Sequence, residues 1–405
     1  MRIVHISAED IGGGAAIACV RHAEAMLSAG LDTQVIVAKK NGRKLFVKEG
    51  ITGIGPFVHS VQQKIHRRLV NAADPVGTFS LMAFGHRFHS LKEVREADVI
   101  FLHWVNGSTL SISEVEKILQ LGKPVYWYMH DMFPITGGCH HSLKCKGFLS
   151  HCEDCPLVHN AFFRILVRKQ FKSKLRHWTR YSNLSFVCPS QWLSALVKSS
   201  RISQGHDVFT IPNVIDTSFY KPLTGKYKEL FGLEPSKRTI LFGASSNNSV
   251  YKGFKDLYEF LKSLDPEKYE GLLIGEYDAS LTTGISMKIR STGYIYDDLS
   301  LIMAYNASDV FVISSAAENY PNVVLEAMSC GVPCVGYKVG GIPELIQDKI
   351  SGYVTAENTP DELVRGIEYV FSDDTRYQEL CKAARNQIEK GNSYKIVRSL
   401  YKGLL

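Results

Sequence analysis

The chain has 405 residues, of which 45% are hydrophobic and 21% are charged, and its formal net charge is +7. This composition is ordinary for a protein with a buried core, excludes a disordered or fibrous chain, and the length favours two domains. The sequence contains no run of eighteen apolar residues, so no membrane-spanning helix is expected. The start of the chain lacks the pattern of a signal peptide. We therefore expect a cytoplasmic protein with nine reduced cysteines.

Strand and helix patterns alternate along the first half of the chain. Apolar runs of strand length occur at 3–7, 34–38, 99–104, 125–129, 184–187 and 208–211. Helical spacing occurs at 15–29, which Gly30 ends, and at 111–121, where Ser111 is a plausible cap. Such alternation predicts α/β architecture with a doubly wound parallel sheet. Residues 51–95 are the least readable region, and we expect a flap there.

Three glycines, Gly12, Gly13 and Gly14, follow the first predicted strand and precede the first helix. Glycine lets the backbone approach a ligand closely, so Gly13 and Gly14 are candidate ligand-binding residues, and a plain tight turn is the alternative. A dinucleotide-binding fingerprint is disfavoured, because Ile17 stands where a third glycine is needed and two lysines follow the second strand.

His130 and Asp131 follow the predicted strand 125–129, at the carboxyl edge where sheets of this kind bind ligands. A lone histidine at such a position is usually structural, but it is also a candidate catalytic residue. Asp131 either orients His130 or caps the segment that follows.

Four cysteines, Cys139, Cys145, Cys152 and Cys155, lie within seventeen residues and end in a Cys-x-x-Cys pair. This spacing suits a closed tetrahedral zinc site in a reducing compartment. Buried or disulfide-paired cysteines are the alternative. We expect a structural zinc in the Cys-rich insert 137–156.

The basic character of the chain is concentrated after this insert. No Asp or Glu occurs between Cys155 and His206, whereas nine Lys and Arg do. Within this segment, residues 161–180 have the spacing of an amphipathic helix, with apolar residues at every fourth position beside a basic stripe. The pattern suits a helix on an anionic membrane surface, and it suits equally a helix that packs its apolar face on the domain.

The second half repeats the alternation. Residues 211–216 mark the expected crossing between domains at 1–212 and 213–389. Apolar runs at 239–243, 271–274 and 310–313 predict strands, and spacing at 255–264, 299–306, 322–330 and 361–371 predicts helices.

Glu318 and Glu326 are separated by seven residues, the first on the loop after strand 310–313 and the second on the next helix. The N–H groups at the start of that helix, from Asn322, Val323 and Val324, can hold a phosphate. The two carboxylates can then accept hydrogen bonds from hydroxyls on either side of it. A nucleotide-sugar offers this order of ribose, diphosphate and sugar. Lys252 is a candidate cation for the diphosphate.

The run from Glu318 through Glu326, followed by Gly331-Val-Pro and Gly340-Gly-Ile-Pro, resembles the donor-site signature of retaining GT-B glycosyltransferases of the group-1 (family 4) type. The cysteine insert is similar to one in exopolysaccharide and colanic-acid-type members. The resemblance implies two Rossmann-like doubly wound domains facing across a cleft, with a last helix, 390–405, that packs back on the first domain.

The resemblance also implies roles for the candidate residues. Lys252 and the helix start would stabilise the leaving diphosphate, Glu318 and His130 would bind the transferred sugar, and Glu326 would bind the ribose. The loop of Gly13 and Gly14 would face the diphosphate and the acceptor. No metal or other cofactor is expected in the chemistry. Many members place an arginine before the lysine, but residues 245–248 are Ser-Ser-Asn-Asn, so a second cation is unassigned.

The predicted function is transfer of a hexose from a UDP- or GDP-linked sugar to a glycan or lipid-linked glycan in surface polysaccharide biosynthesis. The protein would act in the cytoplasm, on the inner face of the plasma membrane, without a nucleic-acid partner. One alternative is a GT-B-like UDP-sugar epimerase, which would not need the basic helix or the cysteine insert. Another is a zinc-knuckle nucleic-acid binder, which leaves the glutamate motif unexplained.

Overall fold

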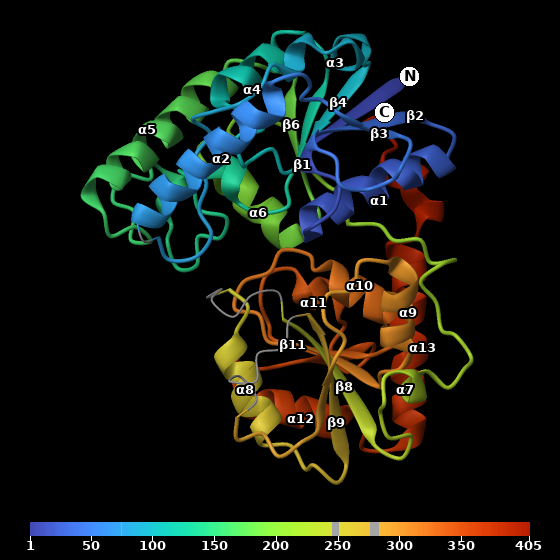
Figure 1. The fold of residues 1–405 in the computed structure, drawn as a ribbon. Helices are drawn as coiled ribbons and strands as arrows, with labels where there is room; N and C mark the ends of the chain where they lie inside the picture. The colour runs from blue at the N-terminus through green and yellow to red at the C-terminus, as the bar shows by residue number, and fades with distance from the viewer. Residues whose placement is uncertain (74, 245–250, 276–282) are drawn as a thin grey trace. The chain divides into compact units, whose positions relative to one another are not determined.

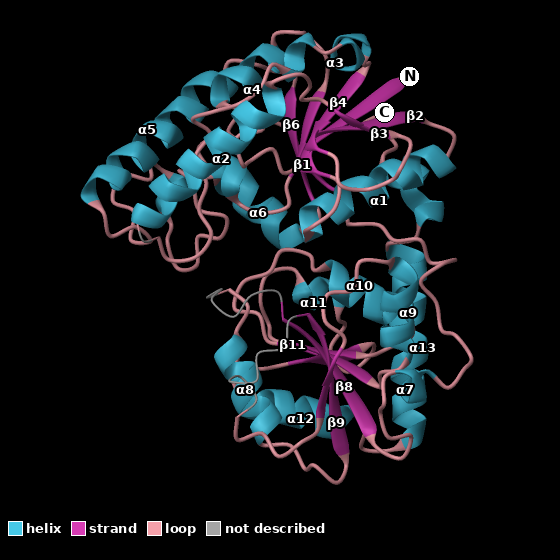
Figure 2. Cartoon of the chain, viewed as in Figure 1, coloured by secondary structure: helices cyan, strands magenta, loops and turns pink. Residues whose placement is uncertain are grey.

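The computed structural model describes residues 1–405 apart from 74, 245–250 and 276–282. The chain divides into two compact units, one of residues 1–214 with 394–405 and one of residues 215–393. The division falls two residues after the expected crossing between 212 and 213. In each unit a single sheet lies among helices (Figure 1, Figure 2).

The first unit is built on a seven-stranded sheet in the order β3-β2-β1-β4-β5-β6-β7, and its strands pair in parallel. The strands are β1 (Arg2–Glu9), β2 (Asp32–Lys39), β3 (Val47–Glu49), β4 (Val99–Leu102), β5 (Val125–Tyr128), β6 (Leu184–Cys188) and β7 (Val208–Thr210). The helices are α1 (Gly14–Ser28), α2 (Gly55–Ala72), α3 (Lys92–Glu96), α4 (Ile112–Leu119), α5 (Ala161–Trp178) and α6 (Gln191–Ser199). Short 3₁₀ turns occur at η1 (Phe88–Ser90), η2 (Phe133–Ile135) and η3 (Gly147–Leu149).

Alternate residues of these strands enter different cores. Ile100 and Leu102 of β4 pack with Trp127 and the helices α4 and α5, whereas Val99 and Phe101 pack on the other side with α1. Because successive side chains of a strand point to opposite faces, both faces of the sheet are covered. The first unit is therefore doubly wound, as the alternating pattern predicts.

The second unit has a six-stranded sheet in the order β10-β9-β8-β11-β12-β13, again with parallel pairing. The strands are β8 (Arg238–Ala244), β9 (Tyr269–Gly275), β10 (Ile289–Ser291), β11 (Val310–Ile313), β12 (Cys334–Gly336) and β13 (Gly352–Val354). The helices are α7 (Tyr227–Leu230), α8 (Phe254–Lys262), α9 (Asp298–Asn306), α10 (Asn322–Ser329), α11 (Ile342–Leu345), α12 (Pro360–Val370) and α13 (Asp374–Gly391). Helices α9, α10 and α13 share one core, and α8 and α12 share the other.

Two regions need comment against the expectations from the sequence. Residues 51–95, which the sequence leaves least readable, hold the 18-residue helix α2 and the short helix α3, and the expected flap stays a prediction. The last segment is not one helix over 390–405, because the long helix α13 ends at Gly391 and Ser393 bridges to Ile215 in extended backbone. Only the turn η5 (Tyr394–Ile396) and the short helix α14 (Val397–Leu400) follow.

Residues 394–405 belong to the first unit and lie beside α1, shown in red and blue in Figure 1. The Tyr401 hydroxyl bonds His22 Nδ1 at 2.9 Å, and the Arg398 guanidinium donates to the carbonyl of Ala29 at the end of α1. These side-chain contacts hold the segment on the first unit without the single helix over 390–405 that the resemblance implies.

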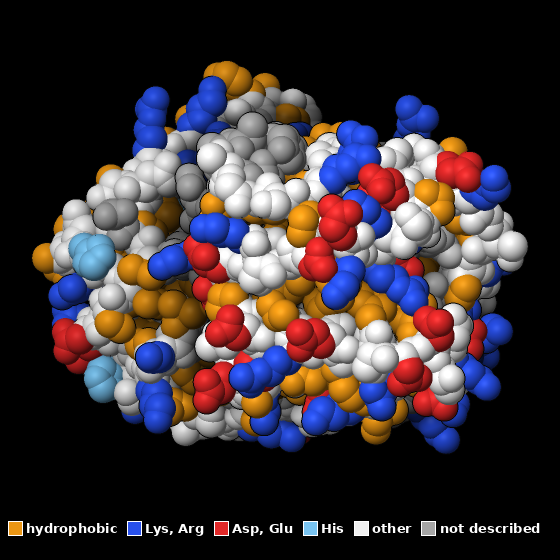
Figure 3. Space-filling view, turned by 90° about the horizontal axis from the view of Figure 1, so that it is seen from below, with side chains coloured by type: hydrophobic (Ala, Val, Ile, Leu, Met, Phe, Trp, Pro, Cys, Tyr) orange, Lys and Arg blue, Asp and Glu red, His pale blue; other side chains and the backbone are white. Residues whose placement is uncertain are grey.

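None of the described helices is both long enough and apolar enough to cross a membrane. On the face seen in Figure 3, Lys and Arg side chains are interspersed with Asp and Glu, so that face carries no continuous basic patch of the kind that binds a nucleic-acid backbone.

Candidate functional site

The candidate donor site lies in the second unit, at the carboxyl end of β11. Two glycines bring neighbouring loops against this end. Gly253 has φ +61, and a Cβ there would lie 1.8 Å from the carbonyl oxygen of Ser314. Gly340 has φ +56, and a Cβ there would lie 1.7 Å from the carbonyl oxygen of Glu318. Only glycine allows both the backbone conformation and the close approach.

Backbone hydrogen bonds join the same loops. The carbonyl of Tyr251 accepts from the N–H of Ala316 at 2.7 Å and of Ala317 at 3.3 Å. Lys252 is thereby placed beside Glu318, and its Nζ donates to Glu318 Oε1 at 2.5 Å. Ser315 Oγ donates to the same oxygen at 3.0 Å. The structure therefore brings together two of the expected catalytic residues as an ion pair.

The N-terminus of α10 lies directly after this loop and receives no side-chain cap. Its N-cap residue is Pro321, whose side chain has no acceptor, and no side-chain cap hydrogen bond forms. The side chains of Asn322 and Val324 are buried, whereas that of Val323 is 40% exposed. The N–H of Val324 bonds the carbonyl of Pro321 at 3.2 Å, and the positive end of the helix dipole lies at this terminus, where it favours an anion.

Glu326 points into the core and not toward solvent. Glu326 is only 3% exposed, and its Oε2 accepts a hydrogen bond from the Tyr305 hydroxyl at 2.7 Å. Burial, together with the charge of Glu326, raises the pKa of Tyr305 well above its ordinary value. The expected ribose contact of Glu326 therefore stays a prediction, with a structural role beside Tyr305 as the competing one.

In the first unit, His130 ends a row of three hydrogen-bonded histidines. His5 Nδ1 lies 2.8 Å from His103 Nε2, and His103 Nδ1 lies 2.9 Å from His130 Nε2. Burial lowers the pKa of His130 to about 4 and that of His5 to about 3, so the row is neutral at physiological pH. A neutral row has one proton per ring, so its direction also sets which nitrogen of His130 carries the proton.

Sequence reasoning missed His5 and His103. A signal was available, because each of the adjacent strands β1, β4 and β5 carries a histidine inside the strand or within two residues of its end. Parallel neighbouring strands bring such residues to one edge of the sheet. The order of the strands, however, is known only from the structure.

Asp131 caps the segment that follows it. Its Oδ1 accepts from the N–H of Phe133 at 2.8 Å, and its Oδ2 lies 2.5 Å from His140 Nδ1. Burial alone would raise the pKa of Asp131, but His140 and the Phe133 N–H hold it below its usual value. Of the two readings left open for Asp131, the capping one fits the structure.

Gly13 and Gly14 stand at the start of α1, where Gly13 is the N-cap residue. Gly12 has φ +99, so the turn itself requires a glycine at that position. A Cβ on Gly13, by contrast, would meet nothing within 4 Å. The open space beside Gly13 leaves room for a ligand, and the expected contact with the donor stays a prediction.

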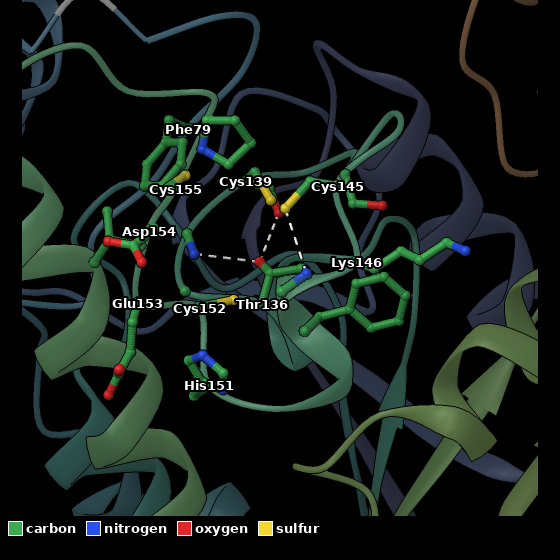
Figure 4. A pocket seen from close by; sticks show the side chains of 17 residues that line it. Phe79, Thr136, Cys139, Cys145, Lys146, His151, Cys152, Glu153, Asp154 and Cys155 are labelled. Atoms are coloured by element: carbon green, nitrogen blue, oxygen red, sulfur yellow. Dashed lines mark hydrogen bonds between the residues drawn. The ribbon is translucent and has the colours of Figure 1, made fainter.

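The four insert cysteines line one cavity of about 290 Å³, which we call the cysteine pocket (Figure 4). All four are free thiols. Burial raises the pKa of Cys152 to about 12 and raises that of Cys139 as well, so without a cation both are protonated.

Among the described residues, a different group has side chains close enough together to hold a metal ion. The ligand atoms of His5, Cys19 and His103 lie within 4.8 Å of one another. The two histidines hydrogen-bond each other at 2.8 Å, which leaves no space for an ion between them. Residues 245–248, where the second phosphate cation was sought, lie outside the described part of the chain.

Helix α5 does not present its apolar face to a membrane. Phe163, Val167 and Phe171, which recur at every fourth position, are all at most 2% exposed and pack in the cores of the first unit. Of the two readings of this helix, packing on the domain is correct. Its basic residues remain largely on the outer side, with Lys172 paired to Glu153 at 3.0 Å.

Comparisons with solved structures identify the fold. Sucrose-phosphate synthase from Thermosynechococcus elongatus is similar with a TM-score of 0.68 at 14% identity, over 100% of this chain and 99% of that one. Anabaena HepE in complex with UDP-glucose is similar with a TM-score of 0.63 at 18% identity, over 100% and 99%. The fold is that of GT-B glycosyltransferases, as expected.

The sequence comparisons give the family of the second unit. Residues 228–387 match the model of the family described as glycosyl transferases group 1, so the chain contains a group 1 glycosyl transferase domain. The chain is 28% identical over 206 residues to N-acetyl-alpha-D-glucosaminyl L-malate synthase of Bacillus anthracis, covering 48% of this chain and 53% of that protein. It is 24% identical over 279 residues to the putative colanic acid biosynthesis glycosyl transferase WcaC of Escherichia coli, covering 66% and 65%. The chain thus spans between half and two thirds of the length of these two relatives.

Proposed function

We propose that the protein is a retaining glycosyltransferase of family 4 that moves a hexose from a nucleotide-diphosphate sugar to a glycan or lipid-linked glycan. The observation that carries this proposal is the Lys252–Glu318 pair beside the uncapped start of α10. A cation and the positive end of a helix dipole suit a diphosphate, and a carboxylate next to them suits sugar hydroxyls. The pathway, surface polysaccharide biosynthesis, is supported by the likeness to WcaC.

The ion pair suggests how the donor engages the site. Lys252 is 44% exposed, so an arriving diphosphate can take it from Glu318 without a large desolvation cost. Glu318 Oε1 is then released to accept from a hydroxyl of the sugar. Lys252 and the N–H groups at the start of α10 stabilise the charge that develops on the departing diphosphate.

The remaining residues have supporting roles in this proposal. His130, neutral because burial lowers its pKa to about 4, donates or accepts a hydrogen bond at the transferred sugar without a change of charge. Glu326 binds the ribose, and no metal takes part in the chemistry. Retention follows if the departing phosphate assists attack on its own face, so the protein need not supply a nucleophile.

The donor nucleotide is UDP or GDP in this proposal. Support for UDP comes from the structural neighbour HepE, which was solved with UDP-glucose. A thermal-shift panel of UDP- and GDP-sugars tests the proposal directly, because a ligand at a hundredfold excess over its Kd stabilises by about 2.7 kcal/mol. Sugar transfer from the ligand that stabilises, with the α-configuration of the donor retained in the product, supports it. Stabilisation by no nucleotide or nucleotide-sugar would overturn it.

A lipid-linked acceptor is supported by helix α2. An ordinary surface helix buries its apolar side and exposes its polar side, whereas α2 buries polar side chains and exposes large apolar ones. Its buried residues include His59 and His66, which bond His86 and the N–H of Leu81. Its outer side instead exposes large apolar side chains, with Phe57 75% and Ile65 41% exposed. The exposed apolar set of α2 and its N-cap is Ile54, Phe57, Val58, Val61, Ile65 and Leu69.

The same helix carries exposed cations and no acidic residue. Lys64, Arg67 and Arg68 are exposed, and basic residues of α5 add to the positive charge of this unit. Apolar side chains flanked by cations suit the surface of an anionic membrane. We therefore assign the proposed peripheral membrane contact, at the inner face of the plasma membrane, to α2 and not to the apolar face of α5.

A further inference from the structure

The cysteine pocket has features that ordinary buried thiols do not share. Its four cysteines come from different turns of the insert, yet their side chains border one cavity of about 290 Å³ (Figure 4). Cys152 has φ +45, a conformation that non-glycine residues rarely adopt and that concentrates at functional sites. Gly147 lies between two of the thiols, since a Cβ there would be 3.5 Å from Cys145 Sγ and 3.6 Å from Cys152 Sγ.

Backbone N–H groups are directed at three of the four sulfurs. Gly147 donates to Cys145 Sγ at 3.4 Å. The backbone of Gly137 hydrogen-bonds Cys152, and the backbone of Leu157 hydrogen-bonds Cys155. Two of these donors stand two residues after the cysteine they bond, which makes a tight turn around the sulfur. Such bonds stabilise a thiolate more than a thiol, because the acceptor is then charged.

Lys174 of α5 anchors the base of the insert. It is fully buried, and its Nζ donates to the carbonyls of Phe133 at 2.5 Å and Thr136 at 3.1 Å. These bonds hold the turn that leads into Cys139.

Of the insert histidines, His140 bonds Asp131 through Nδ1 and Ser80 through Nε2, so neither ring nitrogen is available to a metal. His151 also lines the pocket, but four cysteines complete a tetrahedral zinc site without a histidine ligand. The five remaining cysteines of the chain lie elsewhere in the fold, in strands, in helices and in the turn after α10. We therefore take the four thiols of the pocket as the ligand set.

We propose that Cys139, Cys145, Cys152 and Cys155 bind one structural zinc ion as a closed tetrahedral thiolate site. Zinc prefers this donor set and needs each sulfur at about 2.3 Å. In the structure no three of these sulfurs lie within 4.8 Å of one another. Binding therefore draws them together, and the cavity between them leaves room for the cysteine side chains to turn inward. The ion stabilises the insert by joining its turns.

Metal analysis of the purified chain tests the proposal. We expect about one zinc per chain, and replacement by cobalt should give the intense thiolate-to-cobalt absorption of a tetrahedral four-sulfur site. Cys145→Ser and Cys152→Ser should each bind zinc at least about tenfold more weakly. Cys381→Ser is the matched control, because Cys381 is also half-buried but lies in α13, and it should keep full metal content.

Two further measurements keep the test decisive if a serine variant fails to fold. Removing the metal from the wild-type protein with a chelator should expose four additional thiols to a colorimetric thiol reagent and lower the thermal midpoint. Nucleotide affinity should change little, so failure of the zinc site and failure of the proposed function are distinguishable. A wild-type chain that holds no zinc after reconstitution, or that has the pocket cysteines paired as disulfides, would overturn the proposal.

Discussion

Lys252 and Glu318 hold each other in the structure, although the proposed function gives them different parts of the donor. Such an exposed pair contributes little to stability, about 0–1 kcal/mol. In the proposed function the pair matters because the diphosphate takes Lys252 from Glu318. The carboxylate of Glu318 is then free to bind the sugar. Substitutions at Glu318 should therefore affect turnover more than folding.

Glu318→Gln is predicted to lower turnover by about 10- to 100-fold, since a hydrogen bond to a charged group is worth about 1.5–3 kcal/mol. Affinity for free UDP or GDP should be unchanged or slightly higher, because Lys252 loses its competing partner. Steady-state kinetics and calorimetric titration measure the two effects. Glu357→Gln, an exposed glutamate of the same unit, is the control. Equal losses for nucleotide and nucleotide-sugar would contradict the sugar role.

Glu326 gives a second residue-scale prediction, because its burial beside Tyr305 leaves two roles open. If Glu326 binds the ribose, Glu326→Ala should weaken free nucleotide and nucleotide-sugar alike by about 1.5–3 kcal/mol, while Tyr305→Phe should weaken neither much. Calorimetric titration of both variants decides. If both variants instead lose stability and keep nucleotide affinity, Glu326 is a structural carboxylate.

At the scale of elements, α2 and α5 exchange the roles that hydropathy suggests. The regular apolar stripe of α5 is buried, whereas α2 buries two histidines and Val70 and exposes its other large apolar residues. Periodicity alone reports that a helix has an apolar side, and it does not report whether protein or another surface covers that side.

Replacing Phe57, Val61 and Ile65 of α2 with Gln should release the protein from phosphatidylglycerol-containing vesicles at low salt. Each apolar side chain removed from water contributes about 1.5–3 kcal/mol, and each nearby cation about 1 kcal/mol. Vesicle sedimentation measures the binding, and raised salt should weaken it. Leu230→Gln, which changes an equally exposed apolar residue of the other unit, should bind as wild type. Wild-type protein that ignores these vesicles would show that α2 has a different partner.

At the scale of the whole molecule, the two units differ in their titratable groups. All fourteen histidines and all four tryptophans precede residue 207, so both kinds of residue belong to the first unit. Several of these histidines form the buried row and are uncharged there. Acid should therefore destabilise the first unit selectively, and tryptophan fluorescence reports on that unit alone.

The sign follows from the lowered pKa values of His130, about 4, and His5, about 3, against 6.5 in an unfolded chain. Below pH 6.5 the unfolded chain binds protons that the folded chain does not, so stability is full above that pH and falls as pH falls. Each such histidine contributes a slope of up to about 1.4 kcal/mol per pH unit. Urea midpoints followed by tryptophan fluorescence should drop between about pH 6.5 and 5. Midpoints that stay constant or rise over this range would show that the histidines are charged in the folded state.

The sequence by itself determined the local and repetitive features of this protein. Buried parallel strands need continuous apolar runs, so the long strands and both doubly wound sheets followed from the pattern. The motif from Glu318 to Glu326 also placed one glutamate on a loop and the other on a helix, because that step needs only a few residues of local structure. The four cysteines of the insert could also be recognised as one group from the sequence, since they lie close together along the chain.

Only the tertiary structure decided which distant groups meet. Strand order brings His5, His103 and His130 into one row, and Gly253 and Gly340 hold Lys252 beside Glu318 through contacts between loops far apart in the sequence. It also decided which faces are covered, burying Glu326 and the stripe of α5 and leaving α2 exposed. The physical reason is that an apolar or charged side chain has no intrinsic location, and its burial depends on the elements that the whole chain packs against it.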